Sequence, residues 1–359
     1  MHWRAGSVLS PACAAPERLN AVTFPALREI LAAVDVEMRR VLEDLPVDES
    51  GFGVMLRYPL GWVTADGQAY AVPTGKRIRP LLLMMCAQAA GPDWEKALPA
   101  AAAVELLHNF SLIHDDIEDN SPLRHGRETV WKLWGTANAI NAGDAMFTLA
   151  FRAVQRLAHY GVDPQLSLRA AELFSRAALD LTRGQHLDMG FEYRSTVSVG
   201  QYIEMIGGKT AALLGLCAEL GALIASGDSG RAAHFSQFGF ALGLAFQIHD
   251  DILGIWGDEA QTGKSAASDI LSRKKSLPVL YGLEHSPDLR EIYTLPLDVP
   301  IDVVEVIRLL NAVGAQQHAR KLEQEYSAKS AAALVRANPD AAAAETLRNL
   351  IANLFDRQK

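Results

Sequence analysis

The chain has 359 residues, of which 49% are apolar, 21% charged and 7% aromatic. This composition excludes a disordered protein and is sufficient for a large buried core. A net charge of −8 argues against a general nucleic-acid or anionic-membrane binder, because an acidic field repels both polyanions. Any anionic ligand must therefore be held by local clusters of basic side chains.

The number and spacing of the cysteines and the apolar stretches of the chain bear on where in the cell the protein is located. Cys13, Cys86 and Cys217 are odd in number and far apart, which argues against a disulfide framework or a zinc site. The N-terminus carries no sustained apolar leader, so we expect a reducing, cytoplasmic location. The uncharged stretch 232–249 contains His and Gln and leads into two aspartates, so we interpret it as a buried helix and expect no membrane span.

The first part of the chain divides into an extension, a helix and a long connection. Residues 1–24 lack periodicity and are expected to form a poorly structured extension before a single domain over 25–359. Apolar residues recur at helical spacing over 27–42. Residues 51–75 hold Gly, Pro and aromatic side chains, which predicts a long connection with a short hairpin. Such long loops are often functional.

Beyond Pro80 the chain consists of Ala- and Leu-rich segments separated by Gly and Pro breaks. The expected helices are 80–90, 97–119, 136–159, 165–190, 198–226, 231–253, 267–285, 302–313 and 315–336. The segments 211–225 and 232–249 are apolar on nearly all sides, so they should be central elements surrounded by other helices. The sequence therefore predicts an all-α protein built as one large helical domain.

Carboxylates cluster at the end of the helix expected over 97–119. Asp115 and Asp119 lie one turn apart on one face, with Asp116 beside them. Pro122 stops the helix, so the cluster lies in the last turn, where the helix dipole favours cations. A solvated helix end is the plain alternative. Mg²⁺ typically takes one or two carboxylates with water and substrate phosphates, and this placement favours such a site.

A second acidic pair, Asp250 and Asp251, ends the helix expected over 231–253. Basic side chains lie beside the acidic clusters: Lys76, Arg77, Arg79, Arg124, Arg127, Lys209, Lys264, Arg273, Lys274 and Lys275. Each basic cluster alone is typical of a solvated surface. Arg and Lys side chains beside apolar helices that end in aspartates, however, are suited to bind phosphate oxygens. His108, two turns before Asp115, is expected to contact phosphate rather than only fill the core. The combination indicates a diphosphate attached to a hydrocarbon.

In order along the chain, these motifs resemble those of the trans-isoprenyl diphosphate synthases, also called polyprenyl synthetases. The segments that carry the resemblance are 75–80, 105–119, 123–126, 184–188, 207–210, 246–251, 257–264 and 274–278. Several ordered motifs are far more specific than any one of them. The resemblance implies the isoprenoid synthase fold, a single all-α domain around a deep apolar cavity, and a homodimer.

The resemblance also implies roles for individual residues. Three Mg²⁺ would bridge the diphosphate of an allylic substrate to Asp115, Asp116, Asp119, Asp250 and Asp251. That diphosphate would be contacted by Arg124, Lys209, Thr210, Gln247, Lys264 and Lys274, with Gln185 and Asp188 lining the site. The pocket for isopentenyl diphosphate would contain Lys76, Arg79, His108 and His125. The carboxylates and Lys209 would act directly in the reaction.

Two positions depart from the family pattern. His125 stands where a second arginine would contact isopentenyl diphosphate, so acceptor binding is expected to be weaker and pH-dependent unless Arg127 substitutes. Gly254 stands where the second acidic motif has its third aspartate, which leaves Asp250 and Asp251 as its metal ligands.

The residues below the first acidic motif bear on product length. In the family, an aromatic fifth position and a small fourth position before the motif go with twenty-carbon products, and here these are Phe110 and Ser111. Ser111 lies about 6 Å deeper along the helix than Asp115. We predict geranylgeranyl diphosphate, with farnesyl or a somewhat longer diphosphate as alternatives. Phe110 as a plain core residue is the other interpretation.

The predicted function is Mg²⁺-dependent condensation of isopentenyl diphosphate with an allylic prenyl diphosphate. The alternative is a terpene synthase of the same fold, which ionises a prenyl diphosphate without elongating it, and the change at His125 points weakly that way. Lys76, Arg79 and His108 argue against it, because a cyclase has no use for a second diphosphate pocket. A regulatory partner subunit is disfavoured, because it need not keep paired aspartates.

Overall fold

The computed structural model describes residues 24–43, 45, 51–70, 75, 77–194, 196–257, 268–296 and 299–355. Its first helices are α1 (Phe24–Glu43), α2 (Phe52–Arg57), α3 (Ile78–Ala90), α4 (Leu98–Glu118), α5 (Val130–Trp134), α6 (Thr136–Gln155) and α7 (Pro164–Glu192). The later helices are α8 (Val199–Ile206), α9 (Ala212–Ser226), α10 (Ser229–Trp256), α12 (Ser268–Leu271), α13 (Leu277–His285), α14 (Pro287–Thr294), α15 (Val303–Ala312), α16 (Ala315–Arg336) and α17 (Ala341–Phe355). Strands β1 (Leu123–Arg124) and β2 (Arg127–Glu128) form a short antiparallel hairpin. The predicted all-α fold is confirmed.

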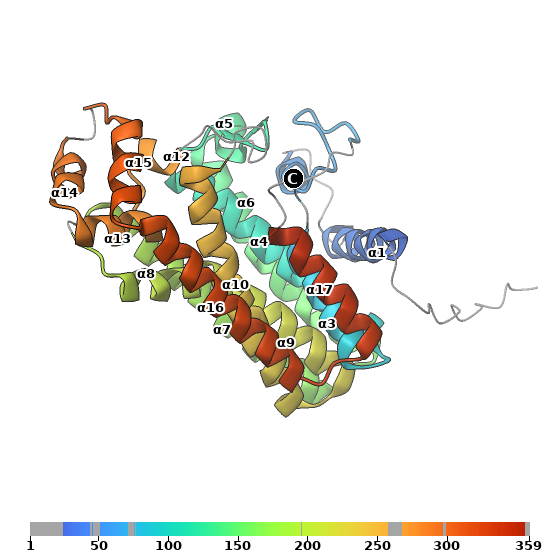
Figure 1. The fold of residues 1–359 in the computed structure, drawn as a ribbon. Coiled ribbons are helices and arrows are strands. Elements are labelled where there is room, and N and C mark those ends of the chain that lie inside the picture. Colours follow the sequence, from blue (N-terminus) through green and yellow to red (C-terminus); the bar gives the residue numbers. More distant parts are fainter. Residues whose placement is uncertain are drawn as a thin grey trace, which may run out of the picture.

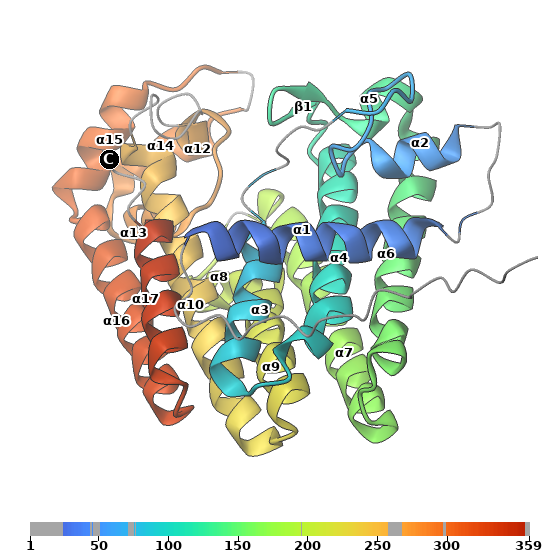
Figure 2. The ribbon, with the colours of Figure 1, turned by 90° about the vertical axis from the view of Figure 1, so that its right-hand side faces the viewer.

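The long helices run side by side as a bundle, and α1 lies across one face of it over α3, α4 and α6 (Figures 1 and 2). The central helices are α9 and α10, as their apolar sequences predict. α10 packs between α9 and α16, while α3 packs on α9 and α4 packs on α6. Figure 2 shows that α4 and α10 end at the same end of the bundle. The two acidic clusters therefore lie at one end of the fold.

Several segments differ from their sequence-based bounds. The helix expected over 198–226 is divided by a π-helical turn, Gly207–Ala211, and the one expected over 267–285 is divided between α12 and α13. The long connection contains α2 and a bridge between Val63 and Ala69, so the expected hairpin is reduced to a minimal one. The predicted extension, residues 1–24, falls outside the described residues except for Phe24, which begins α1.

Two helical stretches of the described chain, Val199–Ser226 and Ser229–Trp256, are long and apolar enough to cross a membrane. Most residues of both are buried inside the bundle, where α9 and α10 supply core side chains such as Leu220, Phe235 and Phe238. Core helices of this kind pass the same test of length and composition. Cys86 and Cys217, both free and buried, belong to the same core.

Candidate active site

The first acidic cluster lies in the last turn of α4. Asp116 is buried and accepts a hydrogen bond from Arg124 Nε of the β-hairpin at 2.8 Å. Burial raises the pKa of Asp115 to about 6, and the positive charges of Lys209 and Arg124 oppose this rise only in part. Asp119 follows as the C-cap residue and is exposed. The end of α4 thus carries more negative charge than its protein neighbours neutralise.

The second acidic cluster lies near the end of α10. Asp251 is buried, and its Oδ2 accepts hydrogen bonds from the Tyr202 hydroxyl and from the Leu277 backbone N–H. Burial raises the pKa of Asp251 to about 6 against the opposing charge of Lys274. Burial disfavours the charged form of Lys274, but the carboxylates led by Asp251 outweigh burial and raise its pKa. Asp250 is half-buried, and its charge acts on both Lys274 and Arg79.

The departure at Gly254 has a counterpart across the site. A Cβ atom at position 254 would lie 2.5 Å from Oδ2 of Asp269 on α12. The Asp269 carboxylate therefore occupies the space that a side chain at 254 would fill, and its charge acts on Asp251 and Lys274. This end of α10 keeps a third carboxylate, which comes from α12 instead of from α10 itself.

A π-helical turn carries Lys209, whose charge acts on Asp115 of the first acidic cluster. The turn lies so close to α7 that a Cβ atom at Gly184 would be 2.1 Å from the Lys209 backbone nitrogen. Only glycine permits this approach, which brings Lys209 Nζ to 2.5 Å from Asp188 Oδ2, one turn further along α7. A π turn inside a helix is frequently a mark of a functional site.

Polar side chains continue around the same centre and link its helices. Gln185 on α7 donates to Glu118 on α4 at 2.6 Å between Nε2 and Oε2. Thr210 donates to Gln247 Oε1 at 2.8 Å, and the Gln247 amide donates to Asp251 Oδ1 at 3.3 Å. Hydrogen bonds thus connect the end of α4 to α7, and the π turn to the end of α10. The sequence alone could not establish that the two acidic helix ends lie near each other.

A cavity of about 440 Å³ opens beside the first acidic cluster. Its polar lining includes Arg79, His108, Asp116, Arg124, His125 and Arg127. Its apolar lining includes Leu112, Ile113, Leu214, Leu242 and Phe246. Several arginines together with apolar side chains in one cavity suit an anionic head group on a small hydrocarbon.

Arg79 is a half-buried cation in the wall of this cavity. Burial and the neighbouring Arg79 charge hold the pKa of His108 well below its usual range, so its neutral ring accepts from Arg79 Nη1 at 3.1 Å. Arg79 Nε has no hydrogen-bond partner among the described residues. A buried Nε–H group without a partner fits an anionic ligand, because an unsatisfied buried donor is costly.

The hairpin supplies His125 and Arg127 to the cavity wall. His125 has a φ of +51°, and burial and the Arg124 charge lower its pKa. Arg127 donates to the carbonyl oxygens of Tyr58 and Val63 at 3.2 and 3.4 Å, and its guanidinium stacks on the Tyr58 ring. The Arg127 side chain therefore fastens the long connection to the hairpin as well as lining the cavity.

The residues expected to bear on product length make contacts within α4 and with α6. Phe110 is nearly buried, and its ring lies 4.8 Å from the His114 ring and 4.9 Å from the Phe147 ring on α6, between centroids. The aromatic contacts continue from Phe147 to Phe151 at 5.0 Å. Ser111 donates to the His108 carbonyl at 2.8 Å. Phe110 thus belongs to a run of aromatic contacts between α4 and α6.

The carboxylates of the two acidic clusters are hard oxygen donors of the kind that Mg²⁺ prefers. Within the described ranges, no three Asp, Glu, His or Cys side chains are arranged to hold a metal ion by themselves. Mg²⁺ needs only one or two carboxylates when water and phosphate oxygens complete its shell. Asp115 is half-buried and Asp251 is buried, and burial raises the pKa of both carboxyls, so a divalent cation would offset the cost of their desolvation. The residues present fit Mg²⁺ held jointly with a diphosphate.

Most of the predicted site residues converge on this end of the bundle. Lys76, Lys264 and the motif residue Asp258 lie outside the described residues. Sequence reasoning missed Tyr202 and Asp269, which hold or complement the second acidic cluster. Tyr202 gave no sequence signal, since it lies 49 residues from Asp251. Asp269 could have been suspected, because an acid five residues before Lys274 is a natural partner for it.

The comparisons with known proteins agree with this geometry. Residues 62–307 match the polyprenyl synthetase family. The chain is 40% identical to a geranylgeranyl diphosphate synthase of Mycobacterium tuberculosis over 80% of this chain and 81% of that protein. It is 42% identical to a (2E,6E)-farnesyl diphosphate synthase of the same species, over 73% of this chain and 67% of that protein. The crystal structure of a Streptomyces coelicolor polyprenyl synthetase superposes with a TM-score of 0.82 at 33% identity, covering 93% and 99% of the two chains.

The helical bundle and its paired acidic helix ends define a prenyltransferase. The chain belongs to the polyprenyl synthetase family, the trans-isoprenyl diphosphate synthases. The resemblance in the motifs is thereby confirmed.

Proposed function

We propose that this enzyme condenses isopentenyl diphosphate with an allylic prenyl diphosphate to make geranylgeranyl diphosphate. The observation that carries the proposal is the adjacency of two anion sites of different kinds. One is the cationic cavity beside Arg79, and the other is the acidic centre between α4 and α10. Two diphosphates can therefore bind side by side, one held by basic side chains and the other jointly with Mg²⁺.

In this proposal the acidic centre holds the allylic substrate. Asp115, Asp116, Asp119, Asp250 and Asp251 would bind the metal ions, and the family's general pattern favours three Mg²⁺. The bound ions would supply electrostatic stabilisation of the diphosphate as it leaves. Lys209, Lys274 and Arg124 lie among these carboxylates and would contact the same diphosphate, with Thr210 and Gln247 orienting it. Lys264, outside the described residues, is proposed for this role from its motif.

The reaction then needs no side-chain nucleophile. The allylic carbon–oxygen bond breaks and its electron pair leaves with the diphosphate, whose growing charge is stabilised by Lys209 and Lys274. The double bond of isopentenyl diphosphate attacks the allylic cation and forms the new carbon–carbon bond. A proton then leaves for the released diphosphate, which restores an alkene. Apolar side chains such as Leu112 and Phe246 exclude the water that would quench the cation.

The acceptor site would be the cavity lined by Arg79, His108 and His125, together with Lys76. The neutral His108 ring orients Arg79, which leaves Arg79 Nε to donate to the diphosphate. His125 adds less charge than an arginine, because its pKa is lowered. This pocket supports elongation over the alternative of a terpene synthase, and the names of the relatives also do not favour that alternative.

Phe110 supports geranylgeranyl diphosphate as the product, because its ring packs against the Phe147 ring, and two bulky rings at this position would limit the growth of the chain. Relatives named for twenty-carbon and fifteen-carbon products are similarly identical to this chain, so the name of a relative does not decide the length. We further infer that residues 25–359 form one catalytic domain. A homodimer and a cytoplasmic location stay predictions from the family resemblance.

The test is incubation of the purified protein with Mg²⁺, labelled isopentenyl diphosphate and, in turn, dimethylallyl, geranyl or farnesyl diphosphate. Chromatography of the dephosphorylated products is expected to show labelled geranylgeraniol. No incorporation of label with any allylic partner would refute elongation. Hydrocarbon released from an allylic substrate alone would support the terpene synthase instead.

A further inference from the structure

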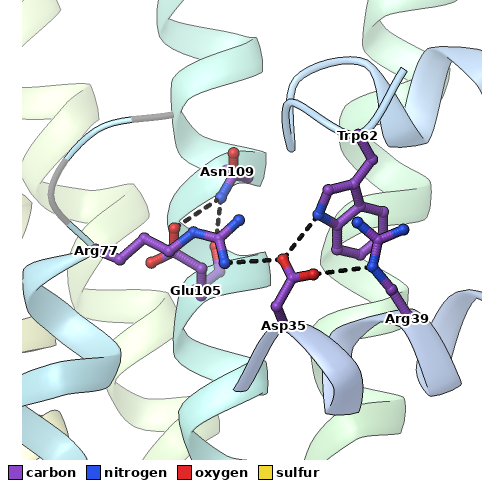
Figure 3. A network of polar contacts seen from close by, with 6 residues as sticks. All are labelled: Asp35, Arg39, Trp62, Arg77, Glu105 and Asn109. Carbon is purple, nitrogen blue, oxygen red and sulfur yellow. Dashed lines mark hydrogen bonds and ion pairs between the residues drawn. The ribbon is translucent and has the colours of Figure 1, made fainter. Parts of the chain in front are cut away.

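One carboxylate, that of Asp35, joins three segments that are far apart in the sequence (Figure 3). Asp35 on α1 accepts on Oδ1 from Trp62 Nε1 at 2.8 Å and from Arg77 Nη1 at 2.9 Å. Its Oδ2 accepts from Arg39 Nε at 2.8 Å. Asp35 therefore holds together α1, the connection after α2 and the start of α3.

Arg77 is the member of this cluster that reaches the cavity. It immediately precedes α3, lies two residues before Arg79 and is part of the cavity lining. Its φ is +45°, a left-handed conformation that a residue other than glycine keeps only when its surroundings hold it. The contact with Asp35 is therefore suited to hold the chain in this conformation where it turns into α3.

The other side of the Arg77 guanidinium faces the buried Glu105 on α4. Burial raises the pKa of Glu105, and the charges of Arg77 and Arg79 oppose that rise. Asn109 donates to the Glu105 carbonyl at 2.8 Å and fixes the same turn of α4. Arg77 is thus held between carboxylates on α1 and α4, and with it the position from which Arg79 enters the cavity.

We infer that Asp35 is a positioning residue for isopentenyl diphosphate: through Arg77 it fixes the start of α3 and so places Arg79 for the acceptor diphosphate. This inference rests on the proposed function, because it takes the cavity beside Arg79 as the acceptor site. Asp35 is not among the residues that line the cavity, so its effect is carried by Arg77.

The same helix offers a matched control. Glu37 is fully buried two residues further along α1, and it accepts from Arg156 Nε and from the Tyr160 hydroxyl, both at 2.6 Å. These partners tie α1 to the segment after α6, and they are not part of the cavity lining. Loss of the Glu37 charge should weaken the packing of α1 without moving the start of α3.

The experiment compares Asp35→Asn with Glu37→Gln by calorimetric titration of isopentenyl diphosphate into the magnesium-free proteins. Asn places an N–H group against one of three donors, so at least one contact of Asp35 is lost. Asp35→Asn is expected to weaken binding about tenfold, the size typical of a lost charge-assisted hydrogen bond. Glu37→Gln is expected to lower the thermal midpoint and leave this affinity within about twofold.

Two further measurements separate positioning from general loss of structure. Steady-state kinetics should show a raised KM for isopentenyl diphosphate in Asp35→Asn, with the KM for the allylic substrate and kcat little changed. Amide hydrogen exchange should be faster over residues 78–83 in Asp35→Asn and unchanged there in Glu37→Gln. If Asp35→Asn does not fold, Asp35→Glu keeps the charge with altered geometry, and a smaller weakening of the same affinity is expected.

Unchanged affinity in the Asp35 variant, or an equal loss in both variants, would overturn the inference. Because the affinity is measured without turnover, this comparison decides the role of Asp35 even if the wild-type protein fails to elongate. That failure would refute the proposed function alone.

Discussion

Replacing Asp115 by asparagine is expected to stabilise the metal-free protein while reducing turnover by orders of magnitude. Burial raises the pKa of this carboxyl from 3.8 to about 6, so the folded state binds its proton more tightly than the unfolded chain does. The stability that the group contributes is fully present below pH 3.8 and is lost as the pH rises to about 6. The shift corresponds to about 3 kcal/mol at most at neutral pH, and about half of that loss has occurred near pH 5.

The assay is the thermal midpoint of the metal-free protein at about pH 5 and about pH 8. Asp115→Asn should raise the midpoint by up to about 4 °C at the higher pH and by about half as much at the lower pH. Asp144→Asn on α6, where the carboxylate is 67% exposed, is the control and should change little. Mg²⁺ with inorganic diphosphate should stabilise the wild type more than the variant. A variant less stable than the wild type at about pH 8 without metal would refute the reasoning.

Three other substitutions test the remaining parts of the site. Phe110→Ala is expected to lengthen the product by opening the space beside Phe147; an unchanged chain length on chromatography would exclude this role. His125→Arg is expected to lower the KM for isopentenyl diphosphate about tenfold by adding a permanent charge, and steady-state kinetics that show no change would contradict it. Gly254→Asp is expected to lower the free energy of unfolding by about 1–3 kcal/mol, because its Cβ would lie 2.5 Å from Asp269 Oδ2. Adding Asp269→Gly to this variant should restore the denaturation midpoint. If the midpoint does not recover, the destabilisation does not come from the contact with Asp269.

Helix positions were predictable because Ala- and Leu-rich segments alternate with Gly and Pro breaks, which act through local backbone preferences. The π turn at 207–211 was not predictable, because it depends on the close approach of Gly184 from a different helix. The five-residue helix α5 was also missed, since so short a segment carries no period. Local rules thus place the long helices, while tertiary contacts decide where they are interrupted.

The same distinction holds for the candidate site. Asp115 and Asp251 could be found because helix ends rich in carboxylates are unusual beside apolar segments. Asp35 could not be found from the sequence. It lies 42 residues from Arg77 in an amphipathic helix, where a single acidic residue does not indicate a functional role. Side chains that act on a ligand leave clusters in the sequence, whereas side chains that position them are recognised only once the fold brings them together.

The parallel course of α4 and α10 has a consequence for the order in which substrates arrive. Both helices direct the negative ends of their dipoles, as well as their carboxylates, at the same space (Figure 2). A free diphosphate approaching this side meets a repulsive field, so the allylic substrate is expected to enter as its magnesium complex. The cavity beside Arg79 is lined by several arginines and is expected to bind a bare diphosphate. Magnesium concentration should therefore change the apparent affinity for one substrate far more than for the other.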